Sequence, residues 1–71
     1  MVDIDRLNRA VEESGMKRYV IAERCGMNKR TLQNKLNGRS VFTAPEIQSI
    51  SHVLRLSKAE RDNIFFAQQV N

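Results

Sequence analysis

The sequence predicts an all-α domain of five short helices. Apolar residues recur at spacings of three and four, no stretch alternates apolar and polar residues as a strand would, and residues that begin or end helices separate the segments. With 71 residues the chain has room for one small domain, so we expect a single domain over residues 1–71. Nothing repeats within the chain, and no linker divides it.

The first helix is expected to start at an Asp3 cap and to run to about Ser14, where Gly15 ends it. The residues predicted to form its apolar face are Ile4, Leu7, Ala10 and Val11.

Residues 18–37 predict two short helices joined by a tight turn. The first is expected over Arg18 to Cys25, and Gly26 follows at a place where the backbone often needs a positive φ. Asn28 is a good cap for the second helix, which should end at Asn37 with Gly38 after it. Its inward side is formed by Leu32 and Leu36, and its outer side by Arg30, Gln33, Asn34 and Asn37, with Lys29 on the flank.

Two capping boxes predict the last two helices. Thr43 and Glu46 form the first box, and Phe42 before it is expected to tuck into the core and to staple against Ile47. The buried stripe of this fourth helix is predicted at Ile47, Ile50, Val53 and Leu54. Ser57 and Glu60 form the second box, and the fifth helix is expected to place Ile64, Phe65 and Ala67 on its apolar side.

The positive charge is concentrated on the third of the chain that holds the two central helices. The formal net charge is +4, yet the segment from Lys17 to Arg39 carries seven basic residues and one acid, a net charge of +6. Such a concentration is typical of proteins that bind a polyanion, although a small domain also needs a charged, solvated surface. A helix face made of Arg, Gln and Asn adds side chains that can pair with guanine or adenine edges in a major groove.

The spacing of Ala22, Gly26, Leu32 and Asn37-Gly38 resembles the helix-turn-helix of the Cro and lambda-repressor type (XRE-like) family. In that family a small residue lets the two helices cross closely, a glycine opens the turn and an apolar residue locks the pair. The resemblance covers the chain from near Asp3 to at least Leu56. It implies a compact five-helix lambda-repressor-like domain, with the helix-turn-helix as helices two and three, that binds double-stranded DNA, usually as a homodimer on a palindromic operator.

The resemblance also implies roles for individual residues. The start of the recognition helix supplies the base readers, which are here Asn28, Lys29, Arg30, Gln33 and Asn34. The family's phosphate contacts fall on Arg18, Asn37 and Arg39, with Lys17, Lys35 and Thr43 as plausible helpers. Arg18 departs from the family pattern, where this position is often Gln, and so favours a charged contact.

Other residues invite more modest predictions. Cys25, the only cysteine, is expected to be an inert core thiol, and His52 a surface residue without a metal site. Tyr19 is expected to pack against the core rather than along a phosphate. Adjacent Phe65 and Phe66 point about 100° apart on a helix, which favours an exposed ring and a dimer interface through the fifth helix. The alternative is that both rings wrap the same edge of the core.

The leading interpretation is a sequence-specific DNA-binding transcriptional regulator, most simply a Cro-like or prophage-type repressor in the cytoplasm. The alternatives are the antitoxin of a toxin–antitoxin pair and a protein-interaction adaptor on the same fold. The sequence has no Gly-rich phosphate loop and no nucleophile spaced to pair with its single His. We therefore expect no enzyme activity, cofactor, metal, small-molecule substrate or membrane partner.

Overall fold

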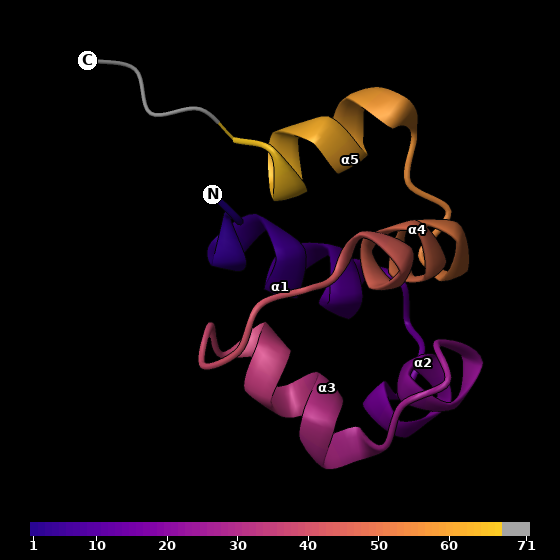
Figure 1. Ribbon diagram of the computed structural model, residues 1–71. Helices are drawn as coiled ribbons and strands as arrows, with labels where there is room; N and C mark the ends of the chain where they lie inside the picture. Colours follow the sequence, from indigo (N-terminus) through magenta and orange to yellow (C-terminus); the bar gives the residue numbers. More distant parts are fainter. Residues whose placement is uncertain (68–71) are drawn as a thin grey trace.

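The computed structural model describes residues 1–67, and these form five helices without a strand (Figure 1). The helices are α1 (Ile4–Glu13), α2 (Arg18–Arg24), α3 (Lys29–Leu36), α4 (Ala44–Val53) and α5 (Lys58–Phe65). The predicted all-α fold is confirmed, and so is the place of the helix-turn-helix as the second and third helices. The prediction of one domain over residues 1–71 includes residues 68–71, which lie outside the described residues.

Four helices start where short polar side chains were predicted to cap them. The side chains of Asp3, Asn28, Thr43 and Ser57 each accept a hydrogen bond from the backbone N–H three residues later. Both capping boxes are complete, because the glutamate of each box also accepts from the N–H of its capping residue. α2 is different, since it begins after Lys17 with no capping hydrogen bond from a side chain.

Four helices end with a residue of positive φ one place beyond the cap, and after α1 this residue is Gly15 (φ +70°), as predicted. After α2 this residue is Gly26 (φ +72°) and after α3 it is Gly38 (φ +77°), as the glycines predicted. After α4 it is Arg55, with φ +56°. After α2, α3 and α4 the next N–H also turns back to a carbonyl of the last turn; after α4 that bond joins Leu56 N to Ser51 O at 2.9 Å.

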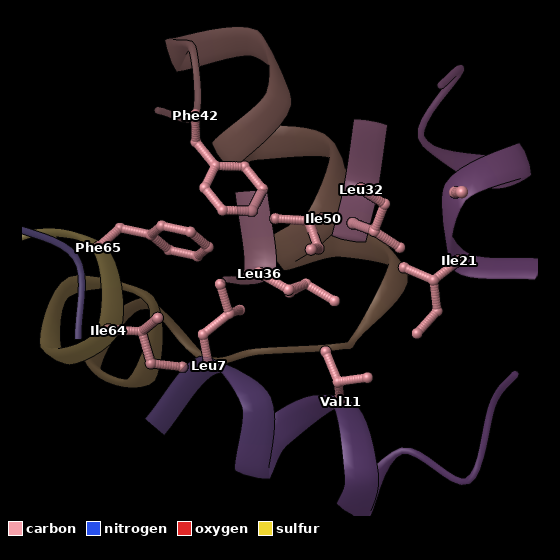
Figure 2. Packing of buried hydrophobic residues seen from close by; sticks show 10 residues of the cluster. Leu7, Val11, Ile21, Leu32, Leu36, Phe42, Ile50, Ile64 and Phe65 are labelled. Carbon is pink, nitrogen blue, oxygen red and sulfur yellow. The ribbon is translucent and has the colours of Figure 1, made fainter. Parts of the chain in front are cut away.

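One apolar core holds all five helices together (Figure 2). The loop residue Phe42 is buried in it, as predicted, and its ring meets the edge of Phe65 with centroids 5.3 Å apart. Such an aromatic pair adds about 0.5–1.5 kcal/mol beyond the area it buries. The buried residues of the cluster are Leu7, Val11, Ile21, Ala22, Leu32, Leu36, Phe42, Ile50, Ile64 and Phe65.

α1 lies between α3 and α5 and contacts both. Its start is joined to the end of α5 by a hydrogen bond from Asp3 N to Ile64 O, 2.7 Å long. α1 therefore links the fifth helix to the helix-turn-helix.

Two details of the predicted packing are wrong. Ala67 lies beyond α5, which ends at Phe65. Tyr19 is 53% exposed, because α2 turns Ile21 inward and a residue two places earlier lies on nearly the opposite side. On α4 the predicted stripe does face the core, with Ile50 fully buried and Ile47, Val53 and Leu54 partly buried against it. Ser51 is buried as well.

Candidate nucleic-acid interface

The contact between α2 and α3 has the close packing that the spacing predicted. Ala22 of α2 is 1% exposed, and Leu32 of α3 is completely buried against the same core. Between the helices, Gly26 takes its positive φ and the N–H of Met27 donates to Ala22 O at 3.0 Å. This turn fixes the direction of α3 and leaves its outer side to solvent.

The start of α3 presents an exposed basic edge formed by Asn28, Lys29 and Arg30. Asn28 uses its side-chain oxygen to cap the helix, accepting from Thr31 N at 2.7 Å, and keeps its amide N–H groups for another partner. Lys29 and Arg30 form no ion pair with any residue of the described part of the chain. Two cations without a protein partner on a protruding helix end suit binding of an anionic or acceptor-rich ligand.

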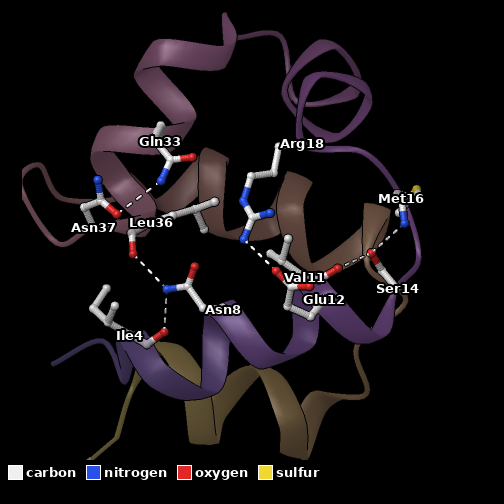
Figure 3. Close-up of polar contacts among 10 residues, drawn as sticks. All are labelled: Ile4, Asn8, Val11, Glu12, Ser14, Met16, Arg18, Gln33, Leu36 and Asn37. Carbon is white, nitrogen blue, oxygen red and sulfur yellow. Dashed lines mark hydrogen bonds and ion pairs between the residues drawn. The ribbon is translucent and has the colours of Figure 1, made fainter.

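Two further predicted base readers lie one turn later and are half-buried. Gln33 donates from Nε2 to Oδ1 of Asn37, 3.1 Å away, so one predicted base reader is bonded to a predicted phosphate contact (Figure 3). Asn34 lies beside it on the same helix. The Gln33 side chain is therefore held in one orientation, with its carbonyl oxygen left as an acceptor.

Lys35 is not on the outer face, where its predicted role as a phosphate helper would place it. The residue is 7% exposed, and its ammonium group contacts Glu46 Oε1 and Val41 O, each at 2.8 Å. It also lies 5.8 Å from the centre of the Phe42 ring. Lys35 comes three residues after Leu32, which places it on the inner flank of α3, where its charge is compensated within the fold.

The carboxylate that pairs with Lys35 also closes the capping box of α4. The hydrogen bond from Lys35 and the bond from Thr43 N, 2.8 Å long, lower the pKa of Glu46 from its ordinary value of 4.5. This ion pair therefore joins the end of α3, the loop after it and the start of α4. The Thr43 hydroxyl takes part by accepting from Glu46 N at 3.3 Å, and the residue itself remains exposed.

The other predicted phosphate contacts lie at two places on the surface. Lys17 and Arg18 are at the start of α2, where the Lys17 ammonium is 6.0 Å from the centre of the exposed Tyr19 ring. Arg18 forms an ion pair with Glu12 of α1, with Nη2 and Oε1 3.0 Å apart. Asn37 and Arg39 are at the end of α3, and the backbone of Arg39 is fixed by its N–H donating to Asn34 O at 2.9 Å.

Asn8 escaped the sequence analysis, although it contacts both α1 and α3. Its Nδ2 donates to Ile4 O within α1 and to Leu36 O at the end of α3, both at 2.9 Å (Figure 3). Asparagine is a poor residue for the middle of a helix, because its side chain competes for backbone hydrogen bonds. An asparagine in the middle of a helix could have indicated a special role for Asn8. The sequence pattern does not identify its partner, however, because Leu36 lies 28 residues further along the chain.

The remaining titratable residues do not gather into a site. His52 is exposed, as predicted. Cys25 is half-buried rather than fully buried, and burial raises the pKa of its thiol. Within residues 1–67, no group of three or more His, Cys, Asp and Glu side chains could hold a metal ion. None of the described helices has the length and apolar character needed to span a bilayer.

Comparison with known families gives a match. A family described as a helix-turn-helix domain matches residues 5–64, which include all of α2, α3 and α4. Neither the curated proteins nor the solved structures give a match.

Proposed function

Because this chain belongs to a helix-turn-helix domain family, we propose that it is a sequence-specific regulator of transcription that binds double-stranded DNA. The observation that carries this proposal is the start of α3, where Lys29 and Arg30 project without an ion-pair partner among the described residues. A Cro-like or prophage-type repressor is the form we favour, acting in the cytoplasm as one domain over residues 1–71.

In this proposal the first two turns of α3 enter the major groove. Arg30 pairs with O6 and N7 of a guanine, and Gln33 or Asn34 pairs with N6 and N7 of an adenine, which are pairings that these side chains make in two-pronged form. Asn28 and Lys29 reach neighbouring bases from the start of the helix. The bond between Gln33 and Asn37 supports this arrangement, because it holds the amide of Gln33 before the DNA arrives.

The phosphate contacts come from both ends of the helix-turn-helix. Lys17 and Arg18 serve one end, and Asn37 and Arg39 the other, with exposed Thr43 beside them. Lys35 has no part in this set, since its charge is paired with Glu46. Phosphate contacts fix the position of the protein on the duplex, whereas base contacts carry the sequence preference.

We further propose that the chain binds a palindromic operator as a homodimer. Phe66 is 55% exposed beside a shallow hollow that also includes Ala44 and Ile47, while Phe65 is 3% exposed and packs in the core. Of the two rings proposed for the interface, only Phe66 can therefore contact a second copy. Val41, which is 81% exposed, lines the adjoining apolar hollow and extends this surface. Two recognition helices would then lie about 34 Å apart, one turn of DNA.

Selection from a pool of random duplexes at two salt concentrations tests the proposal. A palindromic consensus is expected, and its half-site spacing reports the geometry of the dimer. Binding without a consensus, together with a steep fall in affinity with salt, would mean contact with phosphates alone. If no duplex is enriched, DNA recognition is the wrong function.

Sedimentation over a dilution series tests the dimer separately. We expect a dimer at tens of micromolar that Phe66→Ala shifts to monomer, while Tyr19→Ala, which removes another exposed ring, leaves it unchanged. A wild-type monomer that keeps the apolar surface free would instead favour the antitoxin alternative, in which a toxin covers that surface. The adaptor alternative finds less support, because the exposed edge of α3 is basic rather than acidic or apolar.

A further inference from the structure

Two side chains of α1, one turn apart, contact the two ends of the helix-turn-helix. Asn8 reaches the carbonyl of Leu36 at the end of α3, and Glu12 reaches the guanidinium of Arg18 at the start of α2 (Figure 3). Residues four apart lie on the same side of a helix, so both contacts leave α1 from one edge. We call Asn8 and Glu12 the bracing edge of α1.

The Asn8 contact fixes the end of α3. Leu36 is the last residue of that helix, and a carbonyl there has no partner within the helix. Asn8 supplies one of its two N–H donors to this carbonyl and the other to Ile4 O, which leaves the amide no freedom to rotate. The residues that follow immediately are those proposed to contact phosphate, Asn37 and Arg39.

The Glu12 contact fixes the side chain that begins α2. That helix has no capping hydrogen bond from a side chain. Arg18, its first residue, donates instead to Glu12, and this hydrogen bond orients the Arg18 side chain. The pair joins only Nη2 to Oε1, and a guanidinium carries further N–H donors that can still point to a phosphate. The Glu12 side chain is 68% exposed, and an ion pair at such a surface contributes little to folding. The ion pair with Glu12 therefore acts mainly by orienting the Arg18 side chain.

We propose, on the basis of the proposed DNA binding, that Asn8 and Glu12 are positioning residues for the DNA backbone. They hold the phosphate contacts at the two ends of the helix-turn-helix at a fixed separation before the duplex arrives. Fewer side-chain conformations are then lost on binding, which strengthens the complex. The opposing possibility is that Glu12 merely neutralises Arg18 and repels phosphate, and the two possibilities predict effects of opposite sign.

A double-mutant cycle on Glu12 and Arg18 measures that sign. The dissociation constant for a selected duplex is measured by fluorescence anisotropy at several salt concentrations for the wild type, Glu12→Ala, Arg18→Ala and the double variant. We expect Glu12→Ala to weaken binding about two- to tenfold when Arg18 is present, and not to weaken it when Arg18 is absent. The slope of log affinity against log salt should flatten in Glu12→Ala toward the value for Arg18→Ala, a change of up to about 0.9, as for one lost phosphate contact.

Glu13→Ala is the matched control, because it removes the same charge from the neighbouring position. Glu13 is exposed and forms no ion pair within residues 1–67, so its removal should leave binding unchanged or slightly tighter. A parallel double-mutant cycle on Asn8→Ala and Arg39→Ala tests the end of α3. Each of these residues should contribute more to DNA affinity when the other is present.

The outcomes separate this inference from the proposed function. If Glu12→Ala tightens binding in the presence of Arg18, or if Arg18→Ala binds as well as the wild type, the positioning role of Glu12 is wrong while DNA binding stands. If the wild-type chain binds no duplex at all, the proposed function fails and the positioning role fails with it.

Discussion

Lys29 and Lys35 lie at opposite ends of α3, and their ammonium groups have opposite surroundings. Lys29 is exposed and has no ion-pair partner in the described part of the chain, whereas Lys35 is buried against Glu46 and Val41. Within the described residues, the cation in the first turn of this helix is thus left unpaired, whereas the cation in its last turn is paired within the fold. The comparison shows that counting basic residues overstates the charge available to a polyanion, since the charge of Lys35 is already compensated by Glu46.

The largest effect on DNA affinity is expected from reversing the charge of Arg30 in the exposed first turn of α3. Arg30→Glu should weaken binding to the selected duplex by at least about 100-fold, because it removes the proposed guanine contact, worth about 1–3 kcal/mol, and places a carboxylate near phosphate. The stability should change by less than about 0.5 kcal/mol, since the residue is exposed. Anisotropy and thermal unfolding measure the two quantities.

Lys58→Glu makes the same change of charge on α5, far along the chain from α3, at another exposed position. It should reduce binding only slightly. Equal losses in the two variants would show that the charge of Arg30 matters and its position does not.

The next largest effects are expected from replacing a lysine by methionine at either end of α3, once at Lys35 and once at Lys29. Lys35→Met should lower the free energy of unfolding by about 1–3 kcal/mol, less than for a fully buried pair, because Glu46 keeps its bond to Thr43 N. Affinity of the folded protein should stay within about threefold, with an unchanged salt slope. Lys29→Met should have the opposite effect: the affinity for DNA should fall, and the free energy of unfolding should not change. Denaturant unfolding and salt titration give both readouts.

A salt slope that flattens by about 0.9 in Lys35→Met would place the Lys35 ammonium on a phosphate after all. That result would restore the role that its burial excludes in the free protein.

A smaller effect is expected where α3 ends. Gly38→Ala should cost about 1 kcal/mol of stability, because φ is +77° there and an L side chain is strained in that region. The added Cβ would meet Ile4 Cγ1 at 3.6 Å, an ordinary contact, so the cost arises in the backbone. Gly38→Asn should lose less, since asparagine tolerates this conformation. If both variants are as stable as the wild type in denaturant unfolding, the turn has rearranged.

The smallest effect is a dependence of stability on acid. Lys35 and Thr43 lower the pKa of Glu46 from 4.5, so the stability from this carboxylate is complete above that value and is lost as pH falls through the lower folded-state value. Between pH 6 and pH 3, Glu46→Gln should therefore begin less stable than the wild type and approach it as pH falls. A gap between the two proteins that stays constant with pH would mean that the ionised form of Glu46 gives no advantage.

The parts of the fold that were predicted correctly depend on residues close together in the chain. The caps at Asp3 and Asn28 and the turn at Gly26 each involve partners within five residues, so the sequence pattern contains the whole interaction. The exposed start of α3 was predicted for the same reason, from the spacing of Leu32 and Leu36 on its other side.

The parts that were missed depend on partners further along the chain. Lys35 meets an acid 11 residues away, and Asn8 meets a carbonyl 28 residues away. Helical spacing places Lys35 on the inner flank but gives no sign of the carboxylate that makes burial possible. Ser51 is a further case, since its buried hydroxyl has no hydrogen-bond partner within residues 1–67, and neither spacing nor structure explains it.

Arg55, which lies one place beyond the cap of α4 with φ +56°, has a consequence for changing what the protein recognises. A glycine at this position would relieve roughly 1 kcal/mol of backbone strain. Substitutions that introduce new base-reading residues on α3 tend to lower the free energy of unfolding by a similar amount, about 1 kcal/mol. A domain this small has only a few kcal/mol of stability. Arg55→Gly is therefore a natural first step in retargeting the domain to another operator, because it adds stability at a residue that is not one of the proposed DNA contacts.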